Sequence, residues 1–188
     1  MKTKARSSLS ITLTVWRALF LREAVSRLSA RRGAGVWILL EPVVHILFLL
    51  AVLSMVRVHN MAGADLVIFV MIGLIGFFMA RNPALRGMEA INANTALFAY
   101  RQVKPIDTVL VRCLLEGVLM LLVAAILLAG ASLAGHQGWP RDPLPALAAF
   151  AGLWLFGVSL ALPFSVAGEL VPELRDIINM IFRPLYLI

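Results

Sequence analysis

The stretch VLVRCLLEGVLMLLVAAILLAGASL, residues 109–133, decides the fold of this chain. Its charged residues are Arg112 and Glu116, and both lie near its beginning. About 20 mainly apolar residues in an α-helix are enough to cross the roughly 30 Å hydrocarbon core of a bilayer. The strands of membrane barrels alternate apolar and polar residues over short segments, whereas this run is continuous. The stretch therefore predicts a membrane-spanning helix.

Four further apolar segments extend this pattern along the chain. Complete spans are predicted at about 37–56, 62–80 and 144–167, which together with the stretch above makes four. Residues 177–188 begin a fifth span but are too few to cross a bilayer. We therefore expect a single all-α integral membrane domain, and we expect the printed sequence to be a C-terminally incomplete piece of a longer protein.

Small residues in two of these spans mark faces that another helix can approach closely. Gly73 and Gly76 lie in the second span, and Ala148 and Gly152 are four residues apart in the fourth. Small side chains let helix backbones come together inside a bilayer. We expect helix–helix contacts at both places.

The composition excludes a water-soluble fold and a nucleic-acid-binding role. Of the 188 residues, 61% are hydrophobic and 14% are charged, whereas soluble domains are about 45–50% apolar and about 25% charged. The formal net charge is +7, but the basic residues flank apolar runs instead of forming a basic face interleaved with aromatic residues. A single cysteine, Cys113, excludes an internal disulfide and a cysteine-based zinc site.

Lysine and arginine are distributed unevenly between the connecting segments. Eight precede the first span and four lie in the segment 81–107, whereas the other two connections between spans carry one each, Arg57 and Arg141. Basic residues accumulate in the cytoplasmic loops of membrane proteins. We therefore expect a multi-pass protein whose N-terminus and 81–107 segment are cytoplasmic.

A helix is predicted over residues 10–28, before the first span. Leu13, Trp16, Phe20 and Ala24 recur at helical spacing, and Arg22 lies on the opposite side. This pattern is typical of an amphipathic helix lying in the membrane interface, with its basic residues at the lipid headgroups. A surface helix packed on a partner protein would show the same pattern, and the two interpretations are compatible.

Two pairs of ionisable residues lie within the predicted spans. Glu41 and His45 are four residues apart in the first span and share one helical face. Ionisable groups at membrane depth are costly and often functional, so the pair could form a proton relay or an enzymatic dyad. Alternatively, Glu41 contacts a neighbouring helix near the interface. Arg112 and Glu116 have the same spacing at the beginning of the third span, so they can face each other along their helix.

The segment 81–107 is the long polar connection of the chain. It can form a short helix over 83–97, with Leu85, Met88 and Ile91 on one side. A cytoplasmic helix between two spans can dock into a groove of a partner protein. An ordinary interfacial loop helix would look the same, and the residue pattern favours neither interpretation.

Motifs for nucleotide chemistry and for hydrolysis are absent from the sequence. It holds no GxxxxGK[ST] phosphate-binding loop, no GxSxG and no HExxH. We therefore expect this chain to bind no cofactor and no metal and to be no enzyme. Any ATP-driven work must then come from a separate chain.

Several stretches resemble one family of transporters. NTALFAYRQVKPID at 94–107, followed by RCLLE at 112–116, resembles the capsular-polysaccharide export branch of the ABC-2-type permeases. LFLRE at 19–23, GVW at 35–37 and the pair Glu41-Pro42 carry the same resemblance, which runs through essentially the whole chain.

This resemblance implies a fold and a set of partners. Members of the family have six spans, an N-terminal interface helix and a coupling helix between the second and third spans. Two permease subunits pair with two separate ATPase subunits, which use ATP and Mg. The family moves a lipid-linked polysaccharide from the cytoplasm across the bacterial inner membrane, together with periplasmic export partners.

The resemblance also implies roles for particular residues. Residues 89–98 would form the coupling helix, 169–176 would form a second turn facing the ATPase, and an interface helix would precede them. The residues expected to couple to the ATPase are Glu89, Ile91, Asn94, Leu97, Phe98, Tyr100, Arg101, Lys104, Glu173, Arg175 and Asp176. Those expected in the interface helix are Trp16, Phe20, Arg22 and Glu23.

Two other functions remain open on the sequence. One is an ABC-2-type permease for a different cargo, such as O-antigen, teichoic acid or a small lipophilic compound. The other is an intramembrane enzyme that uses Glu41 and His45.

Overall fold

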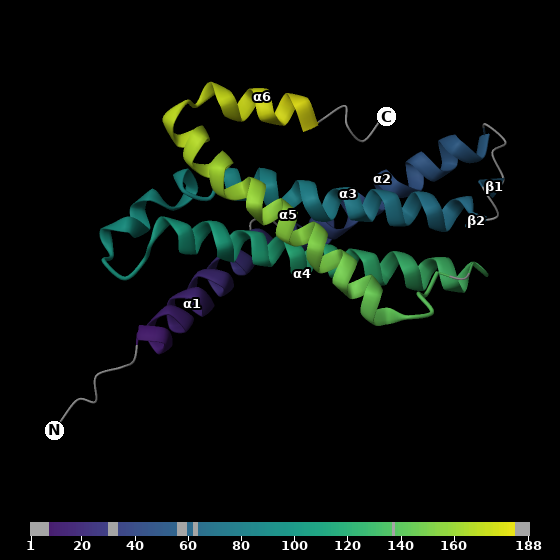
Figure 1. The fold of residues 1–188 in the computed structure, drawn as a ribbon, viewed down its shortest axis with the longest axis horizontal. Coiled ribbons are helices and arrows are strands. Elements are labelled where there is room, and N and C mark those ends of the chain that lie inside the picture. The colour runs from purple at the N-terminus through teal and green to yellow at the C-terminus, as the bar shows by residue number, and fades with distance from the viewer. Residues whose placement is uncertain (1–7, 30–33, 56–59, 62–63, 137, 183–188) are drawn as a thin grey trace.

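The computed structural model describes residues 8–29, 34–55, 60–61, 64–136 and 138–182, and the fold is almost entirely helical (Figure 1). Two short strands pair in antiparallel fashion, with Asn60 opposite Asp65. The elements in chain order are α1 Ser8–Ser29, α2 Ala34–Met55, β1 Asn60–Met61, β2 Ala64–Asp65, α3 Leu66–Met88, the 3₁₀ helix η1 Asn92–Ala99, α4 Pro105–Leu133, α5 Pro143–Leu170 and α6 Glu173–Phe182.

Three helices are long and apolar enough to cross a membrane within the part of the chain that the structure describes. They are α3 from Val67 to Met88, α4 over its whole length, and α5 over its whole length. The first predicted span, 37–56, falls on α2, where Val43–Val52 is a shorter apolar helical stretch among the described side chains. The all-α membrane fold class is therefore confirmed, and the number of spans stays a prediction.

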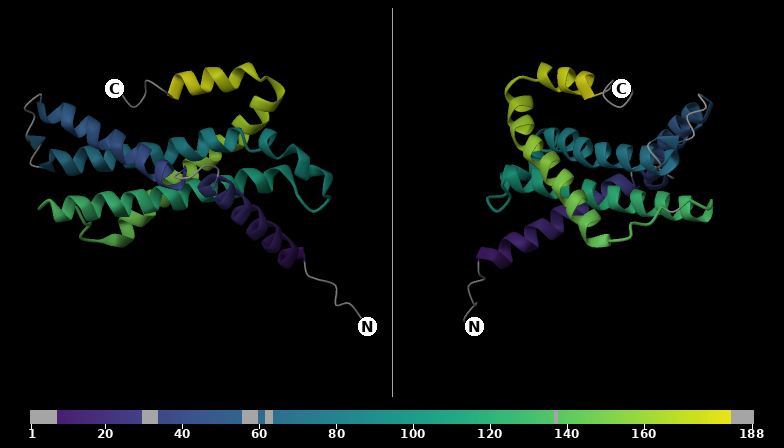
Figure 2. Two further views of the ribbon diagram at one scale, coloured as in Figure 1. Left: turned by 180° about the vertical axis from the view of Figure 1, so that it is seen from behind. Right: turned by 45° about the vertical axis from the view of Figure 1, so that its right-hand side comes forward.

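The helices pack around α3. It runs beside α4 in the opposite direction, and α5 crosses obliquely over it (Figures 1 and 2). Ile75 of α3 and Val123 of α4 are almost fully buried in one cluster, which also takes in Ile46 of α2. The core therefore lies between the predicted spans and is apolar.

The crossing of α3 and α5 depends on two glycines. A Cβ placed on Gly157 of α5 would lie 2.4 Å from the carbonyl oxygen of Ala80 in α3. A Cβ on Gly87 of α3 would lie 2.5 Å from the Cβ of Ala161 in α5. Real Cβ atoms do not approach other atoms this closely, so the two backbones meet at distances that only glycine permits.

Helix α3 begins later and ends later than the predicted second span. Asp65 caps its beginning, where its Oδ1 accepts a hydrogen bond from the backbone N–H of Val67 at 2.9 Å. The helix then continues past Ala80, through eight residues of the predicted polar loop, to Met88. The side chains of Ala84 and Met88 are fully buried, so tertiary packing keeps residues 81–88 helical in spite of their polar sequence.

The coupling segment also differs from its prediction in helix type. Residues 89–98 were expected to form one helix, but Glu89 caps the end of α3 and a 3₁₀ helix follows from Asn92 to Ala99. The next helix, α4, begins at Pro105, four residues before the predicted span. Proline is well suited to the first helical position because its missing N–H would be unpaired there in any case.

The charged turn predicted at 169–176 is much shorter in the structure. Helix α5 continues to Leu170, and α6 begins at Glu173. Ile178 of α6 is buried against Leu85 and Met88 of α3, and this apolar contact explains why the charged residues around it are helical. Residues 183–188, the end of the predicted fifth span, lie outside the described residues.

The two ends of the helix bundle carry different connections. The η1 segment and the α5–α6 turn lie at one end, on the left of Figure 1. The strands β1 and β2 and the connection between α4 and α5 lie at the opposite end. Both segments that were predicted to face the ATPase therefore share one end of the molecule.

Candidate functional site

Helix α1 packs against the beginning of α4, next to η1. Its half-buried residues include Trp16, Phe20, Glu23 and Ala24. Leu13, which was predicted to share this face, is 67% exposed. The face that packs on α4 is therefore partly polar.

A chain of alternating charges joins α1 to α4. Glu23 Oε1 accepts hydrogen bonds from Arg112 Nε at 2.8 Å and from Arg27 Nε at 2.9 Å. Arg27 in turn pairs with Glu116 through Nη1, and Arg86 Nε of α3 lies 3.9 Å from the same carboxylate. The side chains of Glu23, Arg27, Arg112 and Glu116 are each 16% exposed or less.

Arg112 and Glu116 pair with α1. Their spacing would let them face each other along one helix, but each forms its ion pair with a residue of α1. The reason is that α1 presents Glu23 and Arg27, two opposite charges that are also four residues apart. The charges of Arg112 and Glu116 are thus neutralised by ion pairs between α1 and α4, and not by a pair within α4.

The charges of this network support one another. Burial alone would raise the pKa of Glu23, but the guanidinium groups of Arg112 and Arg27 outweigh burial and hold that pKa below its usual range. Burial alone would lower the pKa of Arg27, but Glu116 and Glu23 outweigh it and raise that pKa. Both α1 residues are therefore charged at neutral pH.

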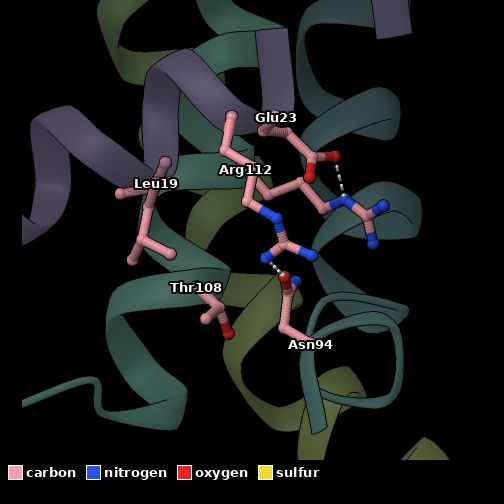
Figure 3. Close-up of a pocket in the computed structure, with 7 residues that line it drawn as sticks. Leu19, Glu23, Asn94, Thr108 and Arg112 are labelled. Carbon is pink, nitrogen blue, oxygen red and sulfur yellow. Dashed lines mark hydrogen bonds and ion pairs between the residues drawn. The ribbon is translucent and has the colours of Figure 1, made fainter. Parts of the chain in front are cut away.

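A small recess lies beside this network (Figure 3). Arg22 of α1 donates a hydrogen bond from Nη1 to Asn94 Oδ1 at 2.9 Å. Asn94 is buried and donates from Nδ2 to the carbonyl oxygen of Ala90 at 2.8 Å. The recess is lined by Leu19, Arg22, Glu23, Asn94, Thr108, Val111 and Arg112.

A second contact ties α1 to the chain on the other side of η1. Trp16 Nε1 donates to Asp107 Oδ1 at 2.8 Å, and Asp107 Oδ2 accepts from the backbone N–H of Lys104 at 3.1 Å. Asp107 is 8% exposed. It was not among the predicted site residues, although an acid at the third position of a helix that begins with proline is a recognisable capping pattern.

The predicted coupling residues divide into two kinds around η1. Asn94 is buried in the junction with α1, and Ile91, Leu97 and Phe98 are half-buried. The exposed ones are Glu89, Tyr100, Arg101 and Lys104, and Tyr100 is 66% exposed. The segment is thus held by the contacts of its buried and half-buried residues, while aromatic and charged side chains stay exposed at its surface.

The second predicted group lies apart from this junction, on α6. Glu173 and Asp176 are exposed, whereas Arg175 is half-buried and donates from Nη2 to Glu169 at 2.8 Å. Helix α6 packs on α3 and α5. The structure therefore brings together Trp16, Arg22, Glu23, Asn94, Arg112 and Glu116, but not the α6 residues.

The intramembrane pair of α2 is described only in part. The ring of His45 meets the ring of Phe78 edge-on, with centroids 5.9 Å apart and an interplanar angle of 76°. The side chain of Glu41 lies outside the described residues. Among the side chains that are described, no group of three histidines, cysteines or acids could hold a metal ion.

Comparison with known proteins gives the family. No protein-family model matches the chain. The polysialic acid transport protein KpsM of Escherichia coli is 34% identical over 184 residues, which cover 98% of this chain and 71% of KpsM. The chain belongs to the capsular-polysaccharide export branch of the ABC-2-type permeases.

Two further relatives of this capsule-export permease carry similar names. The capsule polysaccharide export inner-membrane protein CtrC of Neisseria meningitidis serogroup A is 28% identical over 187 residues, covering 98% of this chain and 71% of CtrC. The capsule polysaccharide export inner-membrane protein BexB of Haemophilus influenzae is 29% identical over 161 residues, covering 86% of this chain and 61% of BexB. The family resemblance of the sequence is confirmed.

Proposed function

We propose that this permease is the membrane-spanning subunit of an ATP-driven exporter that moves lipid-linked capsular polysaccharide from the cytoplasm across the bacterial inner membrane. The observation that carries the proposal is the 34% identity to KpsM over 98% of the chain. The names of CtrC and BexB, which place both in capsule polysaccharide export and in the inner membrane, support it.

ATP hydrolysis belongs to a separate ATPase subunit in this proposal. The 188 residues hold no phosphate-binding loop, and in this proposal the mechanical work comes from a partner that binds ATP and Mg. Two permease subunits pair with two ATPase subunits. Periplasmic export partners then receive the polysaccharide on the far side of the membrane.

The ATPase contacts the end of the molecule that carries η1. Tyr100, Arg101 and Lys104 are exposed there and can bind a partner surface, while Asn94 is held from inside by α1. Helix α6 begins beside the α5–α6 turn at the same end, and its first turn, with the exposed Glu173 and Asp176, forms a second, smaller contact. This arrangement requires η1 and the N-terminus to be cytoplasmic.

The proposal is tested by changing η1 and the exposed residues that follow it, in the complete permease together with its ATPase. In Arg101→Glu and Leu97→Asp, polysaccharide export from the cell should fall at least about tenfold, because a reversed charge or a new charge at this surface weakens the ATPase contact. Arg101→Glu is the sharper variant, since Arg101 is exposed whereas Leu97 is half-buried.

Arg141→Glu is the matched control, because Arg141 is exposed in the α4–α5 connection at the opposite end of the bundle. It should export normally and retain the ATPase on purification. Normal export by both Leu97→Asp and Arg101→Glu, or equal loss in the control, would contradict the proposed coupling site.

A further inference from the structure

Helix α1 is bound at both ends of the stretch 94–107, which holds most of η1 and the exposed residues that follow it. At the N-terminal end, Arg22 Nη1 donates to Asn94 Oδ1 at 2.9 Å. At the C-terminal end, Trp16 Nε1 donates to Asp107 Oδ1 at 2.8 Å. Arg22 and Trp16 are six residues apart on one helix, which corresponds to about 9 Å along its axis.

The two side chains that accept a hydrogen bond from α1 also bond to the backbone of their own stretch of chain. Asn94 Nδ2 donates to the Ala90 carbonyl at 2.8 Å, and Asp107 Oδ2 accepts from the Lys104 N–H at 3.1 Å. A displacement of the backbone at residue 94 or at residue 107 therefore acts on α1 directly, through a hydrogen bond between two side chains. Asn94 is 7% exposed and Asp107 is 8% exposed, so a broken contact would leave a buried polar group without its partner.

Three exposed residues that follow η1 lie between these two points in the chain. Tyr100, Arg101 and Lys104 follow Asn94 and precede Asp107 in the chain. A force that a partner applies to these residues acts on both hydrogen bonds at once. Two anchors on one rigid helix fix its direction as well as its position, which one anchor could not do.

We propose that these two hydrogen bonds form a brace that makes α1 move as one body with the coupling segment, so that ATPase movement reaches the N-terminal helix as well as α3 and α4. Asn94 and Asp107 are the positioning residues of the brace. This inference rests on the proposed function, in which η1 is the ATPase contact. The charge network around Glu23 lies farther along α1 and strengthens the same attachment to α4.

The brace is tested by removing its donors while the packing is kept. Trp16→Phe keeps an aromatic ring and loses the N–H, and Arg22→Met keeps an unbranched apolar stem and loses the guanidinium. The complete permease and its ATPase are reconstituted in proteoliposomes, and polysaccharide transport is measured per ATP hydrolysed. Each variant should keep its ATP hydrolysis and lose about fivefold or more of its transport per ATP, since a charge-assisted hydrogen bond to a buried group is broken.

Three further variants separate the brace from a general loss of stability or of charge. Arg22→Lys should recover part of the transport per ATP, because an ammonium can still reach the Asn94 oxygen. The double variant Arg22→Met with Asn94→Ala should be no worse than the poorer single variant, because both remove the same contact. Arg17→Met removes a positive charge from an exposed position of α1 and should resemble the wild type.

The outcomes distinguish the brace from the proposed function. Wild-type transport per ATP in both Trp16→Phe and Arg22→Met, while Arg101→Glu uncouples transport, would overturn the brace and leave the proposed function standing. An equal loss in Arg17→Met would also overturn the brace, because the effect would then belong to charge alone. Normal transport by Arg101→Glu would remove the proposed coupling site and the brace with it, and would leave the exporter function standing.

Discussion

Arg112 donates a hydrogen bond from Nε to Glu23 over 2.8 Å, although the two residues are 89 positions apart in the chain. The contact joins the beginning of α4 to an N-terminal helix that hydrophobic spacing alone would place on a lipid surface. Arg27 and Glu116 repeat the arrangement one turn farther along, with the signs reversed. The attachment of α1 is therefore specific in register, because sliding it by one turn would bring like charges together.

The first prediction concerns the strength of this attachment. Glu23→Gln should destabilise the protein by about 1–3 kcal/mol, because Arg112 and Arg27 stay half-buried and lose a charged partner. The measurement is thermal unfolding of the purified permease. In a double-mutant cycle, Glu23→Gln with Arg112→Gln should cost less than the sum of the two single changes. Additive costs would show that the two side chains do not interact.

A second prediction concerns pH. The pKa of Glu23 is lowered in the folded protein, because the two guanidinium groups outweigh burial. A carboxyl group with a lowered folded pKa adds stability at pH above its unfolded pKa, about 4.3, and that stability is lost as the pH falls through the folded value. The stability difference between the wild type and Glu23→Gln should therefore be full at about pH 6 and shrink progressively below about pH 4.3. Unfolding temperatures of both proteins over this range give the test, and a difference that stays constant down to low pH would contradict it.

The sequence predicted the helices and most members of the α1 junction, but not how those members pair. Trp16, Arg22 and Asn94 were singled out by resemblance, and the structure joins Arg22 to Asn94. The spacing of Arg112 and Glu116 allows a local pair, whereas their partners in the structure come from a helix about 90 residues earlier. Long-range pairing depends on how helices pack, and one sequence does not encode that in a readable pattern.

The sequence also did not show which glycines lie at helix contacts. Gly73 and Gly152 were expected to lie at helix contacts, yet a Cβ on either would meet nothing within 4 Å in the described part of the chain. Gly76 meets Leu153 at 3.3 Å, but the closest backbone approaches occur at Gly87 and Gly157. Small residues allow close packing at many positions, and the fold uses only some of them.

A third prediction follows from the α3–α5 crossing. Gly157→Ala should destabilise the protein by about 1–3 kcal/mol or more, because its Cβ would lie 2.4 Å from a backbone oxygen that cannot move independently. Gly73→Ala is the matched control on α3, where the added methyl group has open space. The control should unfold at or slightly above the wild-type temperature, because alanine favours helix by up to about 1 kcal/mol over glycine. Equal unfolding temperatures for the two variants would show that the helices do not meet at Gly157.

The last prediction concerns the sidedness of the two ends of the bundle. Tyr100 beside η1 is 66% exposed and Trp139 in the α4–α5 connection is 60% exposed, so a cysteine at either position can react with a thiol reagent. In intact cells whose outer membrane has been made permeable, a reagent that cannot cross the inner membrane should label Trp139→Cys and leave Tyr100→Cys unmodified, because the basic 81–107 segment is expected inside. The native Cys113 is buried and should stay unreactive in both variants. After the inner membrane is also opened, Tyr100→Cys should become labelled, which proves that the site itself is reactive. Labelling of Tyr100→Cys before that step would place η1 on the outer side, where no cytoplasmic ATPase could reach it.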